Sequence, residues 1–107
     1  MDWPTLTPAA RRAIRQLAAK AYERELTAEL GRLHSAFAEW KAGSLSATEL
    51  ATRLQRRTAV VERELAKAYK YNANLDLSVA NAIARGVIAE EEIGEAARDH
   101  LRRLIAK

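Results

Sequence analysis

The chain has 107 residues, of which 49% are apolar, with a formal net charge of +4 and no cysteine. This length fits one domain, and the lack of cysteine excludes disulfides, thiolate nucleophiles and cysteine-based metal sites, with an intracellular location as the default. The first residues lack the features of a signal peptide and no stretch approaches the ~18 apolar residues of a membrane span, so we expect a cytoplasmic protein that stays out of the membrane.

A long helix is predicted over residues 8–42. Thr7 can cap its start, and Pro8 suits the first helical position because its missing N–H has no partner there. Gly43 can adopt the left-handed conformation that ends a helix. At about 1.5 Å per residue, the helix would be about 50 Å long.

Two apolar stripes lie on this predicted helix, roughly 150° apart around its axis. The first contains Ala10, Ile14, Leu17 and Ala21, and the second contains Tyr22, Leu26, Leu30, Leu33, Phe37 and Trp40. One partner cannot cover both. We expect the next helix to cover the second stripe, and either the C-terminal part of the chain or a second subunit to cover the first.

A second helix is predicted over residues 46–71. Ser46 and Glu49 form a capping box, and Leu45 and Leu50 form a hydrophobic staple around it. Because the link from Gly43 is short, this helix should run back along the first as an antiparallel hairpin. Its expected core face contains Ala47, Leu50, Leu54, Thr58, Val61, Leu65 and Ala68.

The remaining residues, 76–107, are predicted to form a small head of two helices. Asp76 or Ser78 can cap the first, which ends at Gly86, and the second should start with three glutamates and end with Arg102, Arg103 and Lys107, as the helix dipole favours. The expected fold class is therefore all-α, with a long helical hairpin and a two-helix head in a single domain, 1–107. Since 23 residues are alanine, large core side chains are few, and an elongated homodimer is expected.

No catalytic, cofactor-binding or metal-binding motif is found. His34 and His100 have no carboxylate or second histidine at helical spacing, so neither forms a metal site on its own helix. The run of glutamates at 90–92 is explained by its place at a helix start. The glycines form neither a P-loop nor a dinucleotide-binding fingerprint. We expect a protein that is not an enzyme and that needs no cofactor or metal.

A basic face lies on the predicted second helix, opposite its core face. Several like charges stack at three- or four-residue spacing, which disfavours an isolated helix by a few tenths of a kcal/mol per pair. Three interpretations stay open: a solvated face, a surface for a carboxylate-rich protein, or a surface for nucleic acid. The residues are Arg53, Arg56, Arg63, Lys67 and Lys70.

Two segments resemble the fluorescence recovery protein family: KAYEREL at residues 20–26 and RGVIAEEEI at residues 85–93. The resemblance covers most of the chain. It implies an all-helical protomer with a long hairpin and a small head, associating as an intertwined dimer. It also implies a role in binding the C-terminal domain of photoactivated orange carotenoid protein and speeding its return to the resting form, which ends quenching of the phycobilisome antenna.

The family's functional positions are carried over unevenly. A Trp, His, Asp and Arg of the family's second helix fall on Thr52, Gln55, Arg56 and Glu62, and none matches. An aromatic head position falls on Leu77 and a basic one on Arg103, while Trp3 is the counterpart of an N-terminal Trp. These departures point to a divergent, fluorescence-recovery-like member.

The expected functional surfaces come from the resemblance and the patterning together. The head should bind a partner through Leu77, Ile83 and Arg103, with the basic face as a second partner surface. The alternatives are a helical nucleic-acid-binding protein that uses the basic face, and an oligomerisation module with another partner. The expected dimer-interface residues are Trp3, Ala10, Ile14, Leu17, Ala21 and Tyr22.

Overall fold

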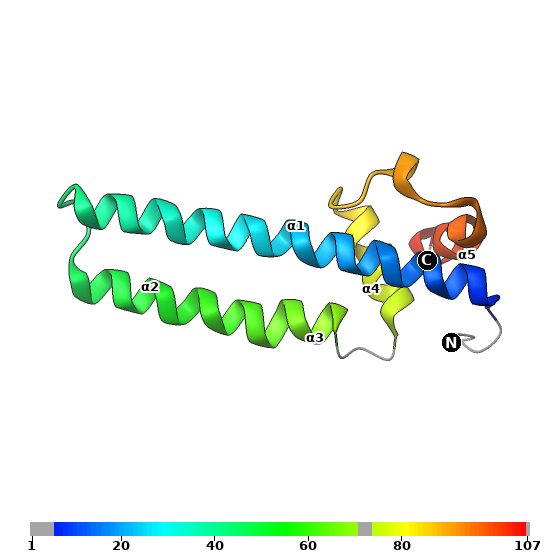
Figure 1. Ribbon diagram of the computed structural model, residues 1–107, viewed down its shortest axis with the longest axis horizontal. Coiled ribbons are helices and arrows are strands. Elements are labelled where there is room, and N and C mark those ends of the chain that lie inside the picture. Colours follow the sequence, from blue (N-terminus) through cyan, green and yellow to red (C-terminus); the bar gives the residue numbers. More distant parts are fainter. Residues whose placement is uncertain (1–5, 71–73, 107) are drawn as a thin grey trace.

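A computed structural model describes residues 6–70 and 74–106, and it is all-helical over these residues, which confirms the all-α part of the predicted fold class (Figure 1). The molecule is elongated, measuring 54 × 25 × 23 Å. A π-helical turn, Val61–Leu65, joins α2 to α3, and a 3₁₀ turn, Glu90–Glu92, precedes α5. The helices are α1 (Pro8–Lys41), α2 (Ala47–Val60), α3 (Ala66–Tyr69), α4 (Leu75–Ala84) and α5 (Glu95–Ala106).

The predicted start and stop signals of the long helices are present in the structure. The Thr7 side chain accepts a hydrogen bond from the Ala10 N–H, and Ser46 and Glu49 form the expected capping box. Gly43 ends the turn after α1 with a φ of 84°. After this turn, α2 runs back beside α1 in the opposite direction, and together they form a long arm (Figure 1).

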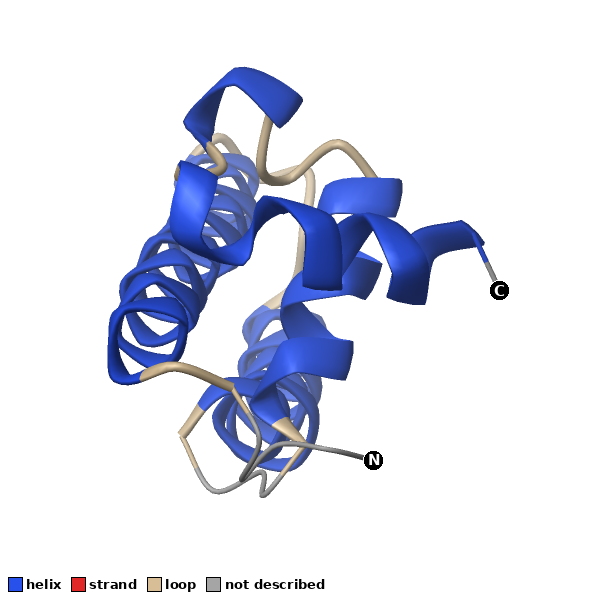
Figure 2. Cartoon of the chain, turned by 90° about the vertical axis from the view of Figure 1, so that its right-hand side faces the viewer, coloured by secondary structure: helices blue, strands red, loops and turns tan. Residues whose placement is uncertain are grey.

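The head, made of α4, the 3₁₀ turn and α5, packs on the N-terminal half of α1 (Figure 1), and Figure 2 views the molecule from this end. Ala10, Ile14, Leu17 and Ala21 are at most 4% exposed, and the last three lie in one core with head residues such as Ile88. The first stripe is therefore covered by the chain's own head. A second subunit, the other covering that was expected, is not needed to bury these side chains.

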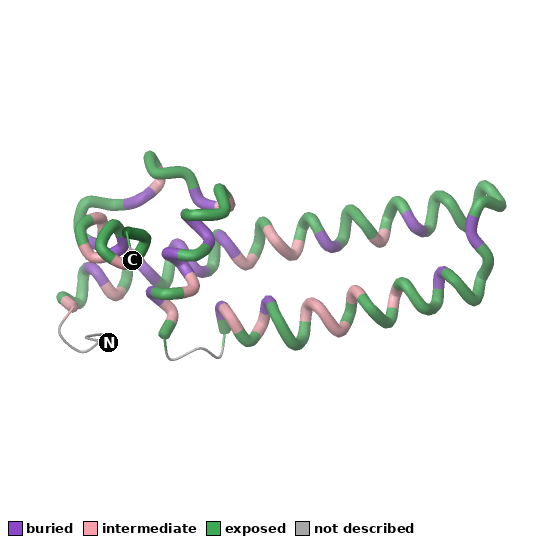
Figure 3. The backbone as a smooth tube through the Cα atoms, turned by 180° about the vertical axis from the view of Figure 1, so that it is seen from behind, coloured by how far each residue is buried: buried purple, intermediate pink, exposed green. Residues whose placement is uncertain are grey.

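The second stripe of α1 is covered only in part, contrary to prediction, with Tyr22, Leu26 and Leu33 half-buried and the other three residues exposed. Leu30 is 56% exposed, and Phe37 and Trp40 are each 42% exposed. The reason is that another face of α1, which contains Ala21, Glu29 and Ala36, is the one buried inside the molecule. Figure 3 shows the result: buried residues gather where the head meets α1 and are sparse along the arm.

The predicted core face of the second helix is correct at Leu50 and Leu65 and wrong at Ala47 and Thr58. Leu50 and Leu65 are buried, but Ala47 and Thr58 are exposed, and Tyr69 is buried where Ala68 was expected. The π-helical turn explains the change after Val61, because one extra residue in a turn rotates the later residues by about 100°. The described helix ends at Tyr69, and residues 71–73 lie outside the described ranges.

The helices of the head begin at other residues than predicted. Asn74, and not Asp76 or Ser78, occupies the N-cap position of α4, and Asp76 lies fully buried inside the helix. The three glutamates form their own 3₁₀ turn, and α5 starts at Glu95. Ile93 separates the two helical segments. It is 1% exposed, and its backbone is extended, with φ −77° and ψ 118°, so the chain is not helical at this buried residue.

Candidate functional site

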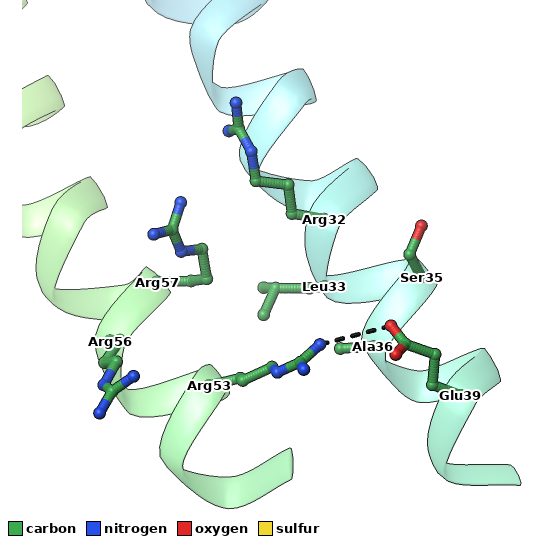
Figure 4. Close-up of a pocket in the computed structure, with 8 residues that line it drawn as sticks. All are labelled: Arg32, Leu33, Ser35, Ala36, Glu39, Arg53, Arg56 and Arg57. Atoms are coloured by element: carbon green, nitrogen blue, oxygen red, sulfur yellow. Dashed lines mark hydrogen bonds and ion pairs between the residues drawn. The ribbon is translucent and has the colours of Figure 1, made fainter. Parts of the chain in front are cut away.

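A basic groove lies between α1 and α2 near the far end of the arm, with a volume of about 450 Å³ (Figure 4). Leu33 and Ala36 contribute its apolar part. Arg53 extends from α2 across the groove toward Glu39, while Arg32 and Arg57 extend from opposite helices into the space between them. The lining residues are Arg32, Leu33, Ser35, Ala36, Glu39, Arg53, Arg56 and Arg57.

The inner end of this groove rests on a buried carboxylate. Glu29 is 7% exposed, and it accepts hydrogen bonds from Arg57 at 3.0 and 3.2 Å and from Arg32 at 2.8 Å. A buried carboxylate needs such partners, since an unpaired charge inside a protein is strongly unfavourable. Arg57, which comes from α2, therefore holds α1 and α2 in register at this point, while Arg32 pairs with Glu29 within α1.

The predicted basic face is divided by the structure. Arg53 and Arg56 line the groove, whereas Lys70 lies over the ring of Tyr22, with its nitrogen 5.5 Å from the ring centroid. Arg63 and Lys67 are exposed on the π-helical turn and on α3. Because the π-helical turn rotates everything after it, the five residues do not share one continuous surface.

Arg32 and Arg57 were not predicted as groove residues. Arg57 lies on the side of α2 that turns toward α1, where an apolar residue is the usual expectation. Its pairing with Glu29 spans 28 positions in the sequence and depends on the register of the two helices. A glutamate within the inward face of α1 was the one signal in the sequence that could have indicated it.

The residues predicted for the head surface differ in their exposure. Leu77 is 45% exposed on α4, and Arg103 is exposed on α5. Ile83, by contrast, is only 9% exposed and belongs to the head core. Its edge lines a shallow hollow with Arg102 and Ile105. Ile83 is buried because α4 packs on both α1 and α5 and has little free surface.

The remaining dimer-interface candidates have mixed positions. Tyr22 is half-buried against the core, with its ring edge-on to that of Tyr69 at 6.4 Å between centroids. Trp3 lies outside the described residues.

Two ionic clusters fasten the head to α1. In one, Glu25 of α1 accepts hydrogen bonds from Arg85 at 2.9 Å and from the Tyr69 hydroxyl. Burial alone would raise the pKa of the Glu25 carboxyl, but these hydrogen bonds outweigh it and the pKa lies below its ordinary value. Burial and the Glu25 carboxylate together raise the pKa of Tyr69 to about 12.

In the second cluster, Arg24 of α1 donates hydrogen bonds to both carboxylate oxygens of Glu92, one of them at 2.7 Å, and to the Val87 carbonyl at 2.8 Å. Lys20 lies 3.3 Å from the same carboxylate. The hydrogen bonds from Arg24, followed by that from the Ala89 N–H, lower the pKa of Glu92 to about 2. The 3₁₀ turn of glutamates therefore links the head to α1 through Glu92.

This second cluster predicts an acid-dependent stability. Since the pKa of Glu92 in the folded chain, about 2, lies below its ordinary value of 4.5, the ionised carboxylate stabilises the fold above pH 4.5 and this contribution is lost as the pH falls toward 2. Glu92→Gln should lower the melting temperature at pH 7 and change it little at pH 2. Glu91→Gln, at the exposed neighbouring position, is the control. Equal melting temperatures for Glu92→Gln and the unchanged chain at pH 7 would contradict the assignment.

A histidine and an aspartate meet inside the head. The Nε2 atom of His100 lies 2.8 Å from Oδ2 of Asp76, whose side chain is fully buried, and the other oxygen accepts the Leu77 N–H at 2.9 Å. The pair joins α5 to α4 over 24 positions, so the sequence spacing within one helix did not reveal it. Within residues 6–70 and 74–106, no three His, Cys, Asp or Glu side chains gather as a metal site requires.

Comparisons with protein-family models, with curated proteins and with solved structures found no match to this chain. Among the described helices, none combines the length and the apolar character needed to cross a bilayer. What the structure defines at this level is an elongated all-helical protein with a long arm and a compact head.

Proposed function

We propose that this protein is a homodimeric, non-enzymatic modulator that binds another protein, built on the scaffold that the fluorescence recovery protein family uses. The observation that carries the proposal is the exposed apolar stripe of α1, formed by Leu30, Phe37 and Trp40. Two further features support it: the resemblance of residues 20–26 and 85–93 to that family, and the separation of the chain into an arm and a head.

The stripe has the properties of a surface that pairs with a second copy. Its three large side chains follow one another along one side of the arm, and Phe37 and Trp40 contact edge-on at 6.5 Å between ring centroids. Soluble monomers rarely leave a long apolar strip in water. A two-fold arrangement would place the same stripe of each chain against its counterpart. The arms would then form the intertwined dimer of helical hairpins, and each head would stay free.

Charge placed in the stripe should break the dimer. Phe37→Glu brings a carboxylate into the centre of the proposed interface, where it would be desolvated without a partner, so the mass measured by light scattering at micromolar concentration should fall from dimer to monomer. Ser35→Glu adds the same charge about 160° around α1 and should leave the dimer intact. A monomeric mass for the unchanged chain would refute the proposed dimer.

The partner surface of the proposal is the head. Leu77 and Ile105, at 45% and 37% exposed, are large apolar side chains on the head, and Arg103 adds an exposed charge there. Arg103 lies about 160° from Ile105 around α5, so the two belong to different sides of that helix. Exposed apolar side chains and arginine are both common in protein interfaces. By the resemblance, the partner is a protein similar to orange carotenoid protein, and the activity is to speed its return from the photoactivated to the resting form.

The direct test is the decay of photoactivated orange carotenoid protein from its red to its orange form. The unchanged chain should speed this decay, and Arg103→Glu should reduce the effect, while the exposed Arg12→Gln serves as the control on α1. An unchanged decay rate at excess protein would remove the photoprotective part of the proposal. If the chain is nevertheless a dimer, an oligomerisation module would then be the better description.

A further inference from the structure

We propose that the groove between α1 and α2 binds an acidic segment of a protein partner, with guanidinium groups on its carboxylates and Leu33 and Ala36 against an apolar side chain. The inference rests on the proposed protein-binding function and adds a second contact surface, on the arm, with a stated chemistry.

Charge complementarity is the first argument. Four arginines line the groove, whereas the carboxylates that face them are Glu39 and the buried Glu29. Glu29 forms ion pairs with Arg32 and Arg57, and Glu39 forms one with Arg53. Arg56 forms no ion pair within the described part of the chain. The groove therefore keeps an excess of positive charge, and guanidinium groups bind carboxylates well because two N–H groups match two oxygens.

The second argument is that one existing ion pair is easily exchanged. Arg53 and Glu39 lie 3.3 Å apart with both side chains nearly half exposed, at 48% and 46%. Such exposed pairs contribute little to stability, so Arg53 can leave Glu39 for a carboxylate of a partner. The buried Glu29 cluster, by contrast, stays in place and keeps the groove walls fixed.

The third argument is that the groove stays accessible in the proposed dimer. Ser35 and Glu39 line the groove, and each stands two residues from Phe37, which places them about 160° away from it around α1. Dimer formation through Leu30, Phe37 and Trp40 therefore leaves the edge of the groove that contains Ser35 and Glu39 accessible, while Leu33, about 40° from Phe37, lies at the edge nearest the interface. One molecule can pair with a second copy and present its groove at the same time.

The test uses the full chain and a fluorescein-labelled, helix-forming peptide of Glu and Leu, with a second peptide in which Gln replaces every Glu. Fluorescence anisotropy at low salt should show binding of the Glu peptide alone. The double variant Arg53→Gln with Arg56→Gln should weaken it about tenfold or more, since two charge-assisted hydrogen bonds are lost. Arg63→Gln removes a charge from the same predicted basic face outside the groove and should weaken it at most about twofold.

Four outcomes would overturn the inference. Equal binding of the Gln peptide would show that carboxylates are not recognised, and equal weakening by Arg63→Gln would show a general attraction to positive charge. Tighter binding of a single-stranded oligonucleotide, lost in the double variant, would assign the groove to phosphate and favour the nucleic-acid alternative. No peptide binding by a chain that is still dimeric would reject the groove alone, and the proposed dimer would stand.

Discussion

Ile14→Ala should lower the free energy of unfolding by about 2–5 kcal/mol, because it removes a large side chain from a fully buried position and leaves a cavity behind. Ile14 lies in one core with residues of α1, α4 and α5, so the substitution should destabilise both the long helix and the head. Urea unfolding followed by circular dichroism measures it. Because the chain's own head covers Ile14, the loss should not depend on protein concentration.

The matched control is Leu30→Ala, on the same helix at 56% exposure. At low protein concentration this variant should lose less than about 1 kcal/mol, since little area leaves or enters water in a single chain. In the proposed dimer its loss should grow as concentration rises. If instead Ile14→Ala were the variant whose effect follows concentration, the first stripe would belong to a subunit interface after all.

The local signals of the sequence predicted the helix boundaries well where a cap defined them. Thr7 with Pro8, and Ser46 with Glu49, start helices in the structure because their side chains bind backbone N–H groups a few residues away. Such interactions are complete within four residues, so they do not depend on tertiary packing. The head boundaries failed for the opposite reason, because the buried Ile93 interrupts what looks locally like one acidic helix start.

The inward face of α1 was not predictable from hydropathy. Counting apolar residues favours the stripe with Phe37 and Trp40, yet the structure turns Glu29 inward and leaves those aromatics exposed. Glu29 tolerates burial only because Arg57 of the neighbouring helix meets it. Periodicity within one helix carries no information on such a partner, which is why the groove and its arginines appeared only with the structure.

The π-helical turn at Val61–Leu65 is the second feature that the periodicity of the sequence does not predict. A template of 100° per residue places Arg53 and Lys70 on one face, but one extra residue in a turn separates them. The turn also brings Tyr69 inward, where its hydroxyl reaches Glu25 and Arg85 of the head fastening. The same local irregularity thus divides the basic face and joins α3 to the head.

His100→Ala should destabilise the head by about 3–5 kcal/mol, the second large effect expected. It removes the partner of Asp76, whose side chain is fully buried and would keep the Leu77 N–H as a hydrogen-bond donor but lose the imidazole. Urea unfolding measures the loss, and amide hydrogen exchange should show it first in α4 and α5, the helices that the pair joins.

Two further variants separate the buried pair from a general effect of losing a histidine. His34→Ala, at an exposed position on the arm, should change stability by less than about 0.5 kcal/mol. Asp76→Leu combined with His100→Leu should recover most of the loss, because apolar side chains of similar size leave no charge unpaired. If His100→Ala were as stable as His34→Ala, the contact at 2.8 Å would contribute nothing and the head would rest on its apolar core alone.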